Sequence, residues 1–149
     1  MRDRRRSREL HSLAGIRELQ RLRAEAAALD ASVSLAARKD ALSSGEELQN
    51  GALSCWTEAV TASEILPDIA ALWSAELRVC DAAVRRLASE AELAGQELAR
   101  RTTSLNAATL RRDIAGETAR RAKKHEIRKE DDAAAQDIVD RHHARRRKK

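Results

Sequence analysis

The sequence predicts an all-α protein, a long antiparallel two-helix coiled-coil hairpin whose second helix is longer than the first. Ala, Leu, Glu, Lys and Arg supply 90 of the 149 residues, a composition typical of long helices and coiled coils. Alternation of β-branched and aromatic residues, which would indicate strands, does not occur. Leu, Ile, Val and Phe make up only about a fifth of the chain, too small a share for the core of a compact α/β enzyme. We therefore expect a single elongated hairpin over residues 1–149.

The first arm of this hairpin is expected at about residues 7–46, because apolar residues recur there at helical spacing. These residues are Leu10, Leu13, Ile16, Leu19, Leu22, Ala26, Leu29, Val33 and Ala36. The pattern fades in the stretch "LSSGEELQNGALS", where Gly45, Gly51 and three serines favour a break in the helix.

The bend is expected at about residues 47–66, together with a short helix that begins at Ser54. Pro67 lacks a backbone N–H, so a helix there either kinks or restarts with Pro67 in its first turn. This part of the chain also holds both tryptophans and both cysteines. The tryptophans either cover the end of a narrow two-helix core or, with Leu66, Ile69 and Trp73 spaced i, i+3, i+7, form an apolar stripe that binds another protein.

The second arm is expected at about residues 67–143, followed by a basic C-terminal tail. Residues at alternating steps of four and three form the a/d positions of a coiled coil. They are Trp73, Leu77, Cys80, Val84, Leu87, Ala91, Ala94, Leu98, Arg101 and Leu105. The pattern fades after Leu105, and a bend near residues 46–66 would place Ser43 opposite about residue 68 and Arg8 opposite about residue 103. Residues 106–143 would then project without a partner helix.

The net charge of +5 is concentrated at the two ends of the chain. Residues 1–9 carry five Arg against two acids, and residues 141–149 carry six Arg and Lys against none. The body between them is mildly acidic. Such basic ends suit nucleic acid, an acidic membrane surface or an acidic protein socket, or they are simply solvated.

Residue patterns that carry catalysis or hold cofactors are not found in the sequence, and we expect neither an enzyme nor a bound cofactor or metal. Gly45 and Gly51 are not followed by the Lys and Ser/Thr of a phosphate-binding loop. "HEIRK" has Lys129 where a zinc-binding helix needs its second His. Cys55 and Cys80 lack metal-site spacing, and without an apolar leader the chain is expected in the cytoplasm with reduced thiols.

The basic, antiparallel hairpin with a longer second arm and "NGALSCW" at its bend, Asn50 to Trp56, resembles the FliJ/YscO-type central stalk of flagellar and type III secretion export machines. The resemblance implies a bacterial protein that acts at the cytoplasmic face of the inner membrane through an export complex. It implies two partners, a hexameric export ATPase and an export gate protein. The gate side would then hold Leu66, Ile69 and Trp73. The ATPase side would hold Arg2, Arg4, Arg5, Arg6, Arg145, Arg146, Arg147, Lys148 and Lys149.

Two other functions fit the same residues. One is a generic structural coiled-coil adaptor or self-associating scaffold. The other is a nucleic-acid-binding helical protein, because "RDRRRSREL" precedes leucines as a basic region precedes a zipper. Against nucleic acid, the basic stretch has no Asn to read adenine, and no aromatic residues interleave with either charge run.

Overall fold

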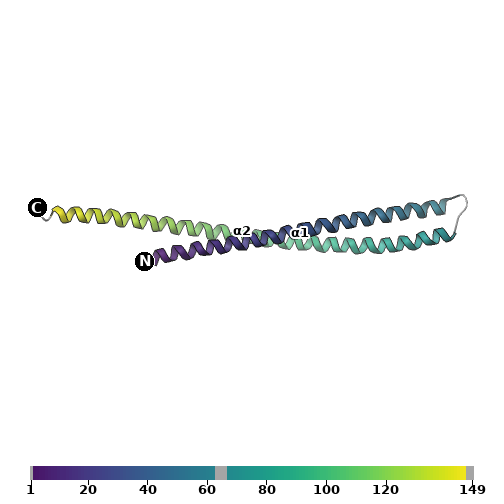
Figure 1. Ribbon diagram of the computed structural model, residues 1–149, viewed down its shortest axis with the longest axis horizontal. Coiled ribbons are helices and arrows are strands. Elements are labelled where there is room, and N and C mark those ends of the chain that lie inside the picture. Colours follow the sequence, from purple (N-terminus) through teal and green to yellow (C-terminus); the bar gives the residue numbers. More distant parts are fainter. Residues whose placement is uncertain (1, 63–66, 147–149) are drawn as a thin grey trace. The chain divides into compact units, whose positions relative to one another are not determined.

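The computed structural model describes residues 2–62 and 67–146, and they form two helices (Figure 1). Helix α1 spans Arg2–Thr61 and has 60 residues, and helix α2 spans Pro67–Arg146 and has 80. The two helices run antiparallel and pack against each other, and the described residues contain no strand. The predicted fold, an all-α two-helix hairpin with a longer second helix, is confirmed.

Helix α1 does not break at residues 46–54, so the predicted end of the first arm and the separate short helix from Ser54 were wrong. The helix continues through Gly45 and Gly51 to Thr61. Each glycine costs a helix interior about 1 kcal/mol, but packing against α2 offsets this cost, since Ala52 is only 5% exposed. The Ser44 hydroxyl donates to the Asp40 carbonyl 3.1 Å away and so bonds within the helix instead of capping a new one.

The two helices end and begin at positions that fit local backbone chemistry. Just past the end of α1, the Ala62 N–H donates to the Glu58 carbonyl at 3.1 Å. Pro67 is the first residue of α2, where its missing N–H leaves no hydrogen bond unmade, and Asp68 places a carboxylate in the first turn. Of the two alternatives for Pro67, a kink or a restart, the structure has the restart.

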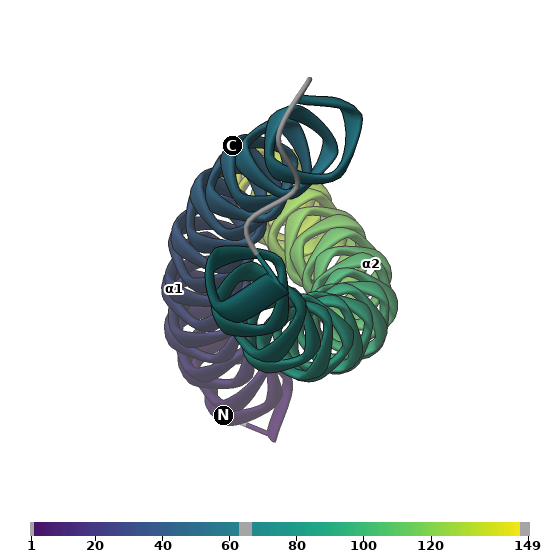
Figure 2. The same ribbon diagram turned by 90° about the vertical axis from the view of Figure 1, so that its right-hand side faces the viewer.

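The packed chain divides into two units, which we call the bend unit and the terminal unit. The bend unit comprises residues 25–103, and the terminal unit comprises the segments up to Ala24 and from Ser104 onward. Figure 2 looks at the end where the chain passes from α1 to α2, and there the two helices of the bend unit lie side by side.

Pairing within the bend unit differs from the predicted register by about 20 residues. Arg38 forms an ion pair with Glu90, and the Gln49 side-chain amide donates to Asp81 at 3.4 Å. These contacts place Ser43 opposite the part of α2 near Leu87, not near residue 68. The error follows from the position of the bend, which the uninterrupted α1 moves toward Pro67.

The interface of the bend unit combines large and small residues from both helices. The predicted a/d residues of α2 from Trp73 to Leu98 are all half-buried. Facing them, α1 contributes several Ala and one Gly, and a Cβ on Gly45 would lie 3.0 Å from Leu87 Cδ1. The register also sets half-buried Trp56 opposite Trp73, so the tryptophans sit in the interface near the bend.

The terminal unit is also a paired structure, so the prediction of an unpartnered segment from residue 106 was wrong. Arg112 Nε lies 3.2 Å from Glu18 Oε2, and Arg4 Nη2 lies 2.7 Å from Glu130 Oε1. Only the part of α2 beyond Glu130, which continues to Arg146, extends past these pairs. At 1.5 Å per residue this extension is roughly 24 Å long.

The a/d pattern of α2 does not end at Leu105 but continues through the terminal unit in small and charged residues. The a/d positions that follow Leu105 are all buried or half-buried: Ala108, Arg112, Ala115, Ala119, Ala122 and Glu126. The corresponding positions of α1 are Ser7, Leu10, Ala14, Arg17, Arg21 and Ala24. Ala115 and Ala119 are 9% and 3% exposed. The interface is therefore narrow and contributes little apolar area.

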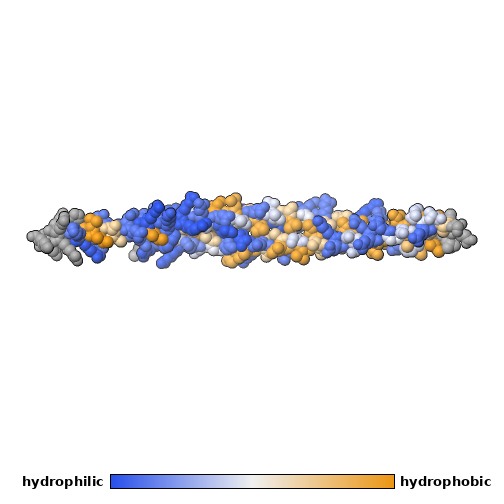
Figure 3. All heavy atoms as spheres, turned by 90° about the horizontal axis from the view of Figure 1, so that it is seen from above, coloured by the Kyte–Doolittle hydropathy of each residue, from blue (hydrophilic) through white to orange (hydrophobic). Residues whose placement is uncertain are grey.

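The apolar residues expected to form the inner face of the first arm lie mainly on the solvent side of α1. Of that set only Leu10 is half-buried, whereas Leu19 is 59% exposed and Leu29 61%. Apolar side chains accordingly appear among the charged ones on the surface (Figure 3). The physical reason is that α1 carries two heptad patterns, and α2 packs against the one rich in Ala, which permits close approach of the helices.

Candidate functional site: a charged cluster in the terminal unit

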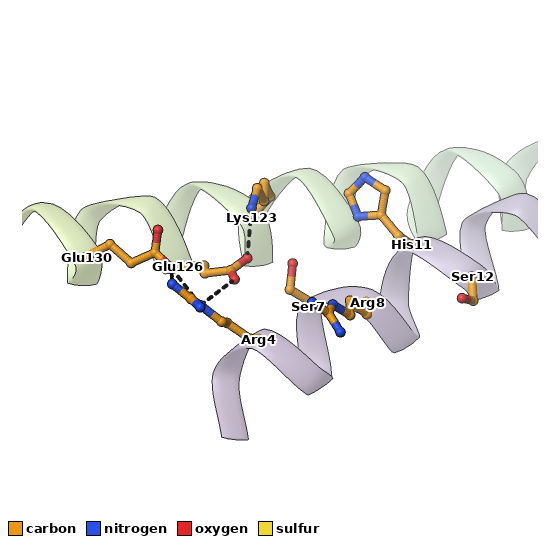
Figure 4. Close-up of a pocket in the computed structure, with 8 residues that line it drawn as sticks. All are labelled: Arg4, Ser7, Arg8, His11, Ser12, Lys123, Glu126 and Glu130. Carbon is orange, nitrogen blue, oxygen red and sulfur yellow. Dashed lines mark hydrogen bonds and ion pairs between the residues drawn. The ribbon is translucent and has the colours of Figure 1, made fainter. Parts of the chain in front are cut away.

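Charged and polar side chains from both helices meet where the start of α1 packs on α2 (Figure 4). Ser7 and Glu126 occupy facing interface positions and are 4% and 8% exposed. Arg4 stands one turn before Ser7, and Glu130 one turn after Glu126. Spacings of three residues on α1 and four on α2, each about one helical turn, thus bring two residues of each helix into one cluster.

Arg4 bridges both carboxylates of this cluster. Its Nε donates to Glu130 Oε1 at 2.9 Å and lies 3.9 Å from Glu126 Oε1, while Nη2 lies 2.7 Å from Glu130 Oε1. On the other side, Lys123 Nζ donates to Glu126 Oε2 at 3.1 Å. Figure 4 shows the Arg4 and Lys123 side chains converging on Glu126 from α1 and α2. Two cations therefore neutralise a carboxylate that the interface covers.

These contacts shift the pKa values of Glu126 and Arg4. Hydrogen bonds from Lys123 and Ser7, with the nearby charges of Lys123 and Arg4, hold the pKa of Glu126 below its ordinary value, although desolvation opposes them. The hydrogen bond to Glu130, and that carboxylate's charge, raise the pKa of Arg4. Glu126 thus stays ionised in the folded terminal unit down to a lower pH than a free Glu side chain does.

The cluster opens into a groove of ≈ 770 Å³ that is also lined by Arg8, His11 and Ser12 (Figure 4). Arg8 is exposed, and within the described part of the chain it makes no ion pair or hydrogen bond. Ser7 donates to a carboxylate and not to His11, so these side chains do not form the nucleophile and base pair of covalent catalysis. The arrangement can instead exchange its ion pairs with an acidic surface.

The predicted ATPase-side residues divide between described and undescribed positions. Arg4, Arg5 and Arg6 lie on the first turns of α1 and are exposed. Arg5 Nε pairs with Glu9 at 3.0 Å. Arg2, Arg145 and Arg146 belong to the two helices, and Arg147, Lys148 and Lys149 lie outside the described residues.

Of the three predicted gate-side residues, the structure describes Ile69 and Trp73, and these two differ in exposure. Ile69 is 42% exposed, but Trp73 is half-buried at an interface position opposite α1, and Leu66 lies outside the described residues. Sequence reasoning missed two exposed apolar residues of the same helix, Leu72 at 67% and Val79 at 63%. The signal available in the sequence was that Leu72 and Val79 are seven residues apart and that both lie outside the a/d positions.

Three further features bear on other kinds of site: groups of metal-ligating side chains, cysteine thiols and membrane-spanning helices. In residues 2–62 and 67–146, no three His, Cys, Asp or Glu side chains are grouped so that they could hold a metal ion. Cys55 and Cys80 are half-buried free thiols. No helix in the described part of the chain has a stretch long and apolar enough to cross a membrane.

The charged cluster itself was also missed from the sequence. The signal that could have found it is the continuation of the seven-residue repeat from Leu105 to Glu126, which places that carboxylate at an interface position.

Comparison of the chain with protein-family models, with curated proteins and with solved structures finds no match.

Proposed function

We propose that the chain is a non-enzymatic central stalk of a type III or flagellar protein export apparatus, which links the hexameric export ATPase to the export gate. The observation that carries this proposal is the placement of the chain ends. The hairpin gathers the basic start of α1 and the longer, basic end of α2 into the terminal unit, while the bend belongs to the other unit. A stalk needs such a division, with one unit for each partner.

On the ATPase side, the proposal rests on exposed cations at the start of α1. Arg6 is exposed and has no ion pair or hydrogen bond within the described part of the chain. Arg4 has a side chain that is 65% exposed, and an acidic socket can replace its ion pairs with Glu130 and Glu126. Such contacts are attractive over about 10 Å at 0.1 M salt and weaken as salt rises. An asymmetric hairpin held in a ring would favour unequal states of the ATPase subunits.

On the gate side, the proposal is revised to the exposed residues Ile69, Leu72 and Val79. They lie on one side of α2 at spacings of three and seven residues, close after its start at Pro67. Trp73 is half-buried and is therefore left out of this set. Apolar anchors of this kind lose binding when truncated and depend little on salt.

The ATPase contact is tested by pull-down of the purified hexameric ATPase at two salt concentrations. The double variant Arg4→Glu, Arg6→Glu should bind at least about tenfold more weakly than wild type, since it presents carboxylates to an acidic socket. Arg100→Glu makes the same kind of charge change at an exposed position of the bend unit. This control should bind as wild type does.

The gate contact is tested with the purified gate domain. Ile69→Ser, Leu72→Ser should weaken gate binding at both salt concentrations and leave ATPase binding intact. Leu93→Ser, at a leucine that is 61% exposed on the same helix, is the matched control. If neither partner binds the wild-type chain, the stalk function is excluded and the adaptor function replaces it.

A further inference from the structure

A second groove of the terminal unit, of ≈ 300 Å³, lies on the flank of the helix pair opposite the charged cluster. Arg6 lines this groove and Arg4 lines the other, and two residues correspond to about 200° around a helix, so these side chains lie on opposite sides of the interface. The same holds on α2 for His125 and Lys123. Among their described lining residues, the two grooves share only Ser7.

The second groove presents donors for an anion from both helices. Arg6 comes from α1, and Arg121 and His125 come from α2. Arg6 and His125 are exposed, and neither makes an ion pair or hydrogen bond within the described part of the chain. Half-buried Leu10 and buried Ser7 close the floor. No described residue that lines this groove is acidic, whereas two carboxylates line the groove of the charged cluster.

The carboxylates next to these cations leave them accessible to a ligand. Arg121 Nη2 lies 2.6 Å from Glu117 Oε1, and the two side chains are 78% and 59% exposed. An ion pair this exposed is weak, so a ligand of higher charge can take the place of Glu117. Glu9, three residues after Arg6, pairs instead with Arg5 at 3.0 Å.

We propose that this groove binds a diphosphate group, with Arg6 and Arg121 each contacting one phosphoryl group and His125 donating a further hydrogen bond. The planar guanidinium group fits the oxygens of a phosphoryl group in a bidentate manner. Two guanidinium groups, one from each helix, therefore suit two linked phosphoryl groups better than a single carboxylate, which would occupy one of them. The Thr118 hydroxyl is not a donor to the ligand, because it donates to the Ile114 carbonyl at 2.7 Å.

The size and lining of the groove indicate that the diphosphate group itself is recognised. Its volume is at the lower end of the range of about 300–1,000 Å³ for small-molecule sites. None of its described lining residues is a Phe, Tyr or Trp on which a base could stack. A nucleoside attached to the diphosphate group should therefore add little to binding.

This site goes beyond the proposed stalk function, and its test needs neither an ATPase nor a gate. The full chain is titrated with pyrophosphate in a calorimeter at 0.1 M salt and without divalent cations. Arg121→Gln should weaken binding about tenfold, because it removes charge-assisted hydrogen bonds to the ligand. Glu117→Gln should instead tighten binding about threefold, since it frees Arg121 and removes a neighbouring negative charge. A gain of this kind cannot arise from loss of folding.

Arg8→Gln is the matched control, because Arg8 is an equally exposed cation of the same unit that lines the other groove. It should bind pyrophosphate as wild type does. Inorganic phosphate should bind about tenfold more weakly than pyrophosphate, and ADP should bind about as tightly as pyrophosphate. Circular dichroism of each variant checks that helicity is retained.

Three outcomes would overturn the proposal. If pyrophosphate does not bind at millimolar concentrations, the groove is not a diphosphate site. If Arg8→Gln weakens binding as much as Arg121→Gln does, the anion is attracted by the basic surface in general and not by this groove. If ADP binds and pyrophosphate does not, the nucleoside and not the diphosphate group is recognised.

Discussion

The same heptad repeat of α2 runs through the bend unit and the terminal unit, but its interface positions hold different kinds of residue in the two units. In the bend unit, α2 presents Leu77, Val84 and Leu87 at interface positions. In the terminal unit the same positions hold Ala115, Ala119 and the carboxylate of Glu126. A covered Leu contributes roughly 1.5–3 kcal/mol, and an Ala methyl about 0.8. The bend unit is therefore expected to be held by apolar burial and the terminal unit by close approach and ion pairs, so the terminal unit should open first.

The largest effect is expected from Leu87→Asp, which places a carboxylate in the interface of the bend unit beside Gly45. Leaving such a charge half-buried and unpaired should cost several kcal/mol. Thermal unfolding followed by circular dichroism should show the loss. Leu93→Asp is the matched control, since Leu93 is 61% exposed on the same helix. Equal melting of the two variants would contradict the assigned interface.

A smaller effect is expected when the narrow interface of the terminal unit is overpacked. Ala119 is 3% exposed, and Ala119→Leu should cost about 1–3 kcal/mol because a leucine does not fit between closely packed helices. The exposed Ala133 supplies the control, Ala133→Leu. Hydrogen exchange should show faster exchange in residues 4–24 for the first variant only. Slower exchange there would mean that the interface has room for larger side chains.

Acid should weaken the terminal unit through Glu126. Its pKa is lowered on folding by Lys123 and Ser7, so its contribution is fully present above the pKa of the unfolded chain, near 4.5. The contribution is then lost as pH falls through the lower folded value. Glu126→Gln should remove this part of the pH dependence, as measured by unfolding at a series of pH values. Glu117→Gln, at an exposed residue, should leave the profile as in wild type.

The smallest effects are expected at two glycines of α1. A Cβ on Gly51 meets nothing within 4 Å, so Gly51→Ala should stabilise the helix by about 0.5–1 kcal/mol. A Cβ on Gly45 would lie 3.0 Å from Leu87 Cδ1, and moving that side chain should cancel part of the same gain. Melting temperatures measured in parallel should rank Gly51→Ala above Gly45→Ala. The reverse order would show that α1 and α2 do not approach closely at Gly45.

Much of the fold could be predicted from the sequence because the heptad pattern from Trp73 to Leu98 contains large residues, from Trp73 to Leu87 and again at Leu98, that stand out from their neighbours. The continuation of this heptad pattern from Ala108 to Glu126 could not be predicted, since alanine is also common on exposed helix faces of this chain. The more apolar pattern of α1, including Leu19 and Leu29, was taken for its inner face. Only the packing shows that α2 covers the alanines instead.

The bend was misplaced for a related reason. Gly45 and Gly51 weaken a helix locally, but tertiary packing of Ala52 and Trp56 against α2 overrides that preference. The register error of about 20 residues followed from this one misplacement. Of the candidate site, the basic residues at the start of α1 were predicted, whereas the carboxylates of Glu126 and Glu130 that bind Arg4 became visible only once the register was known.

The difference between the two units is tested most directly by hydrogen exchange of the full chain, resolved by mass spectrometry into peptides of each unit. The account predicts that peptides from residues 70–98 and 35–59 exchange most slowly. Peptides from residues 4–24 and 108–126 should exchange faster, and faster still when salt is raised, because ion pairs help to hold them. Equal protection of the two units, unchanged by salt, would contradict it.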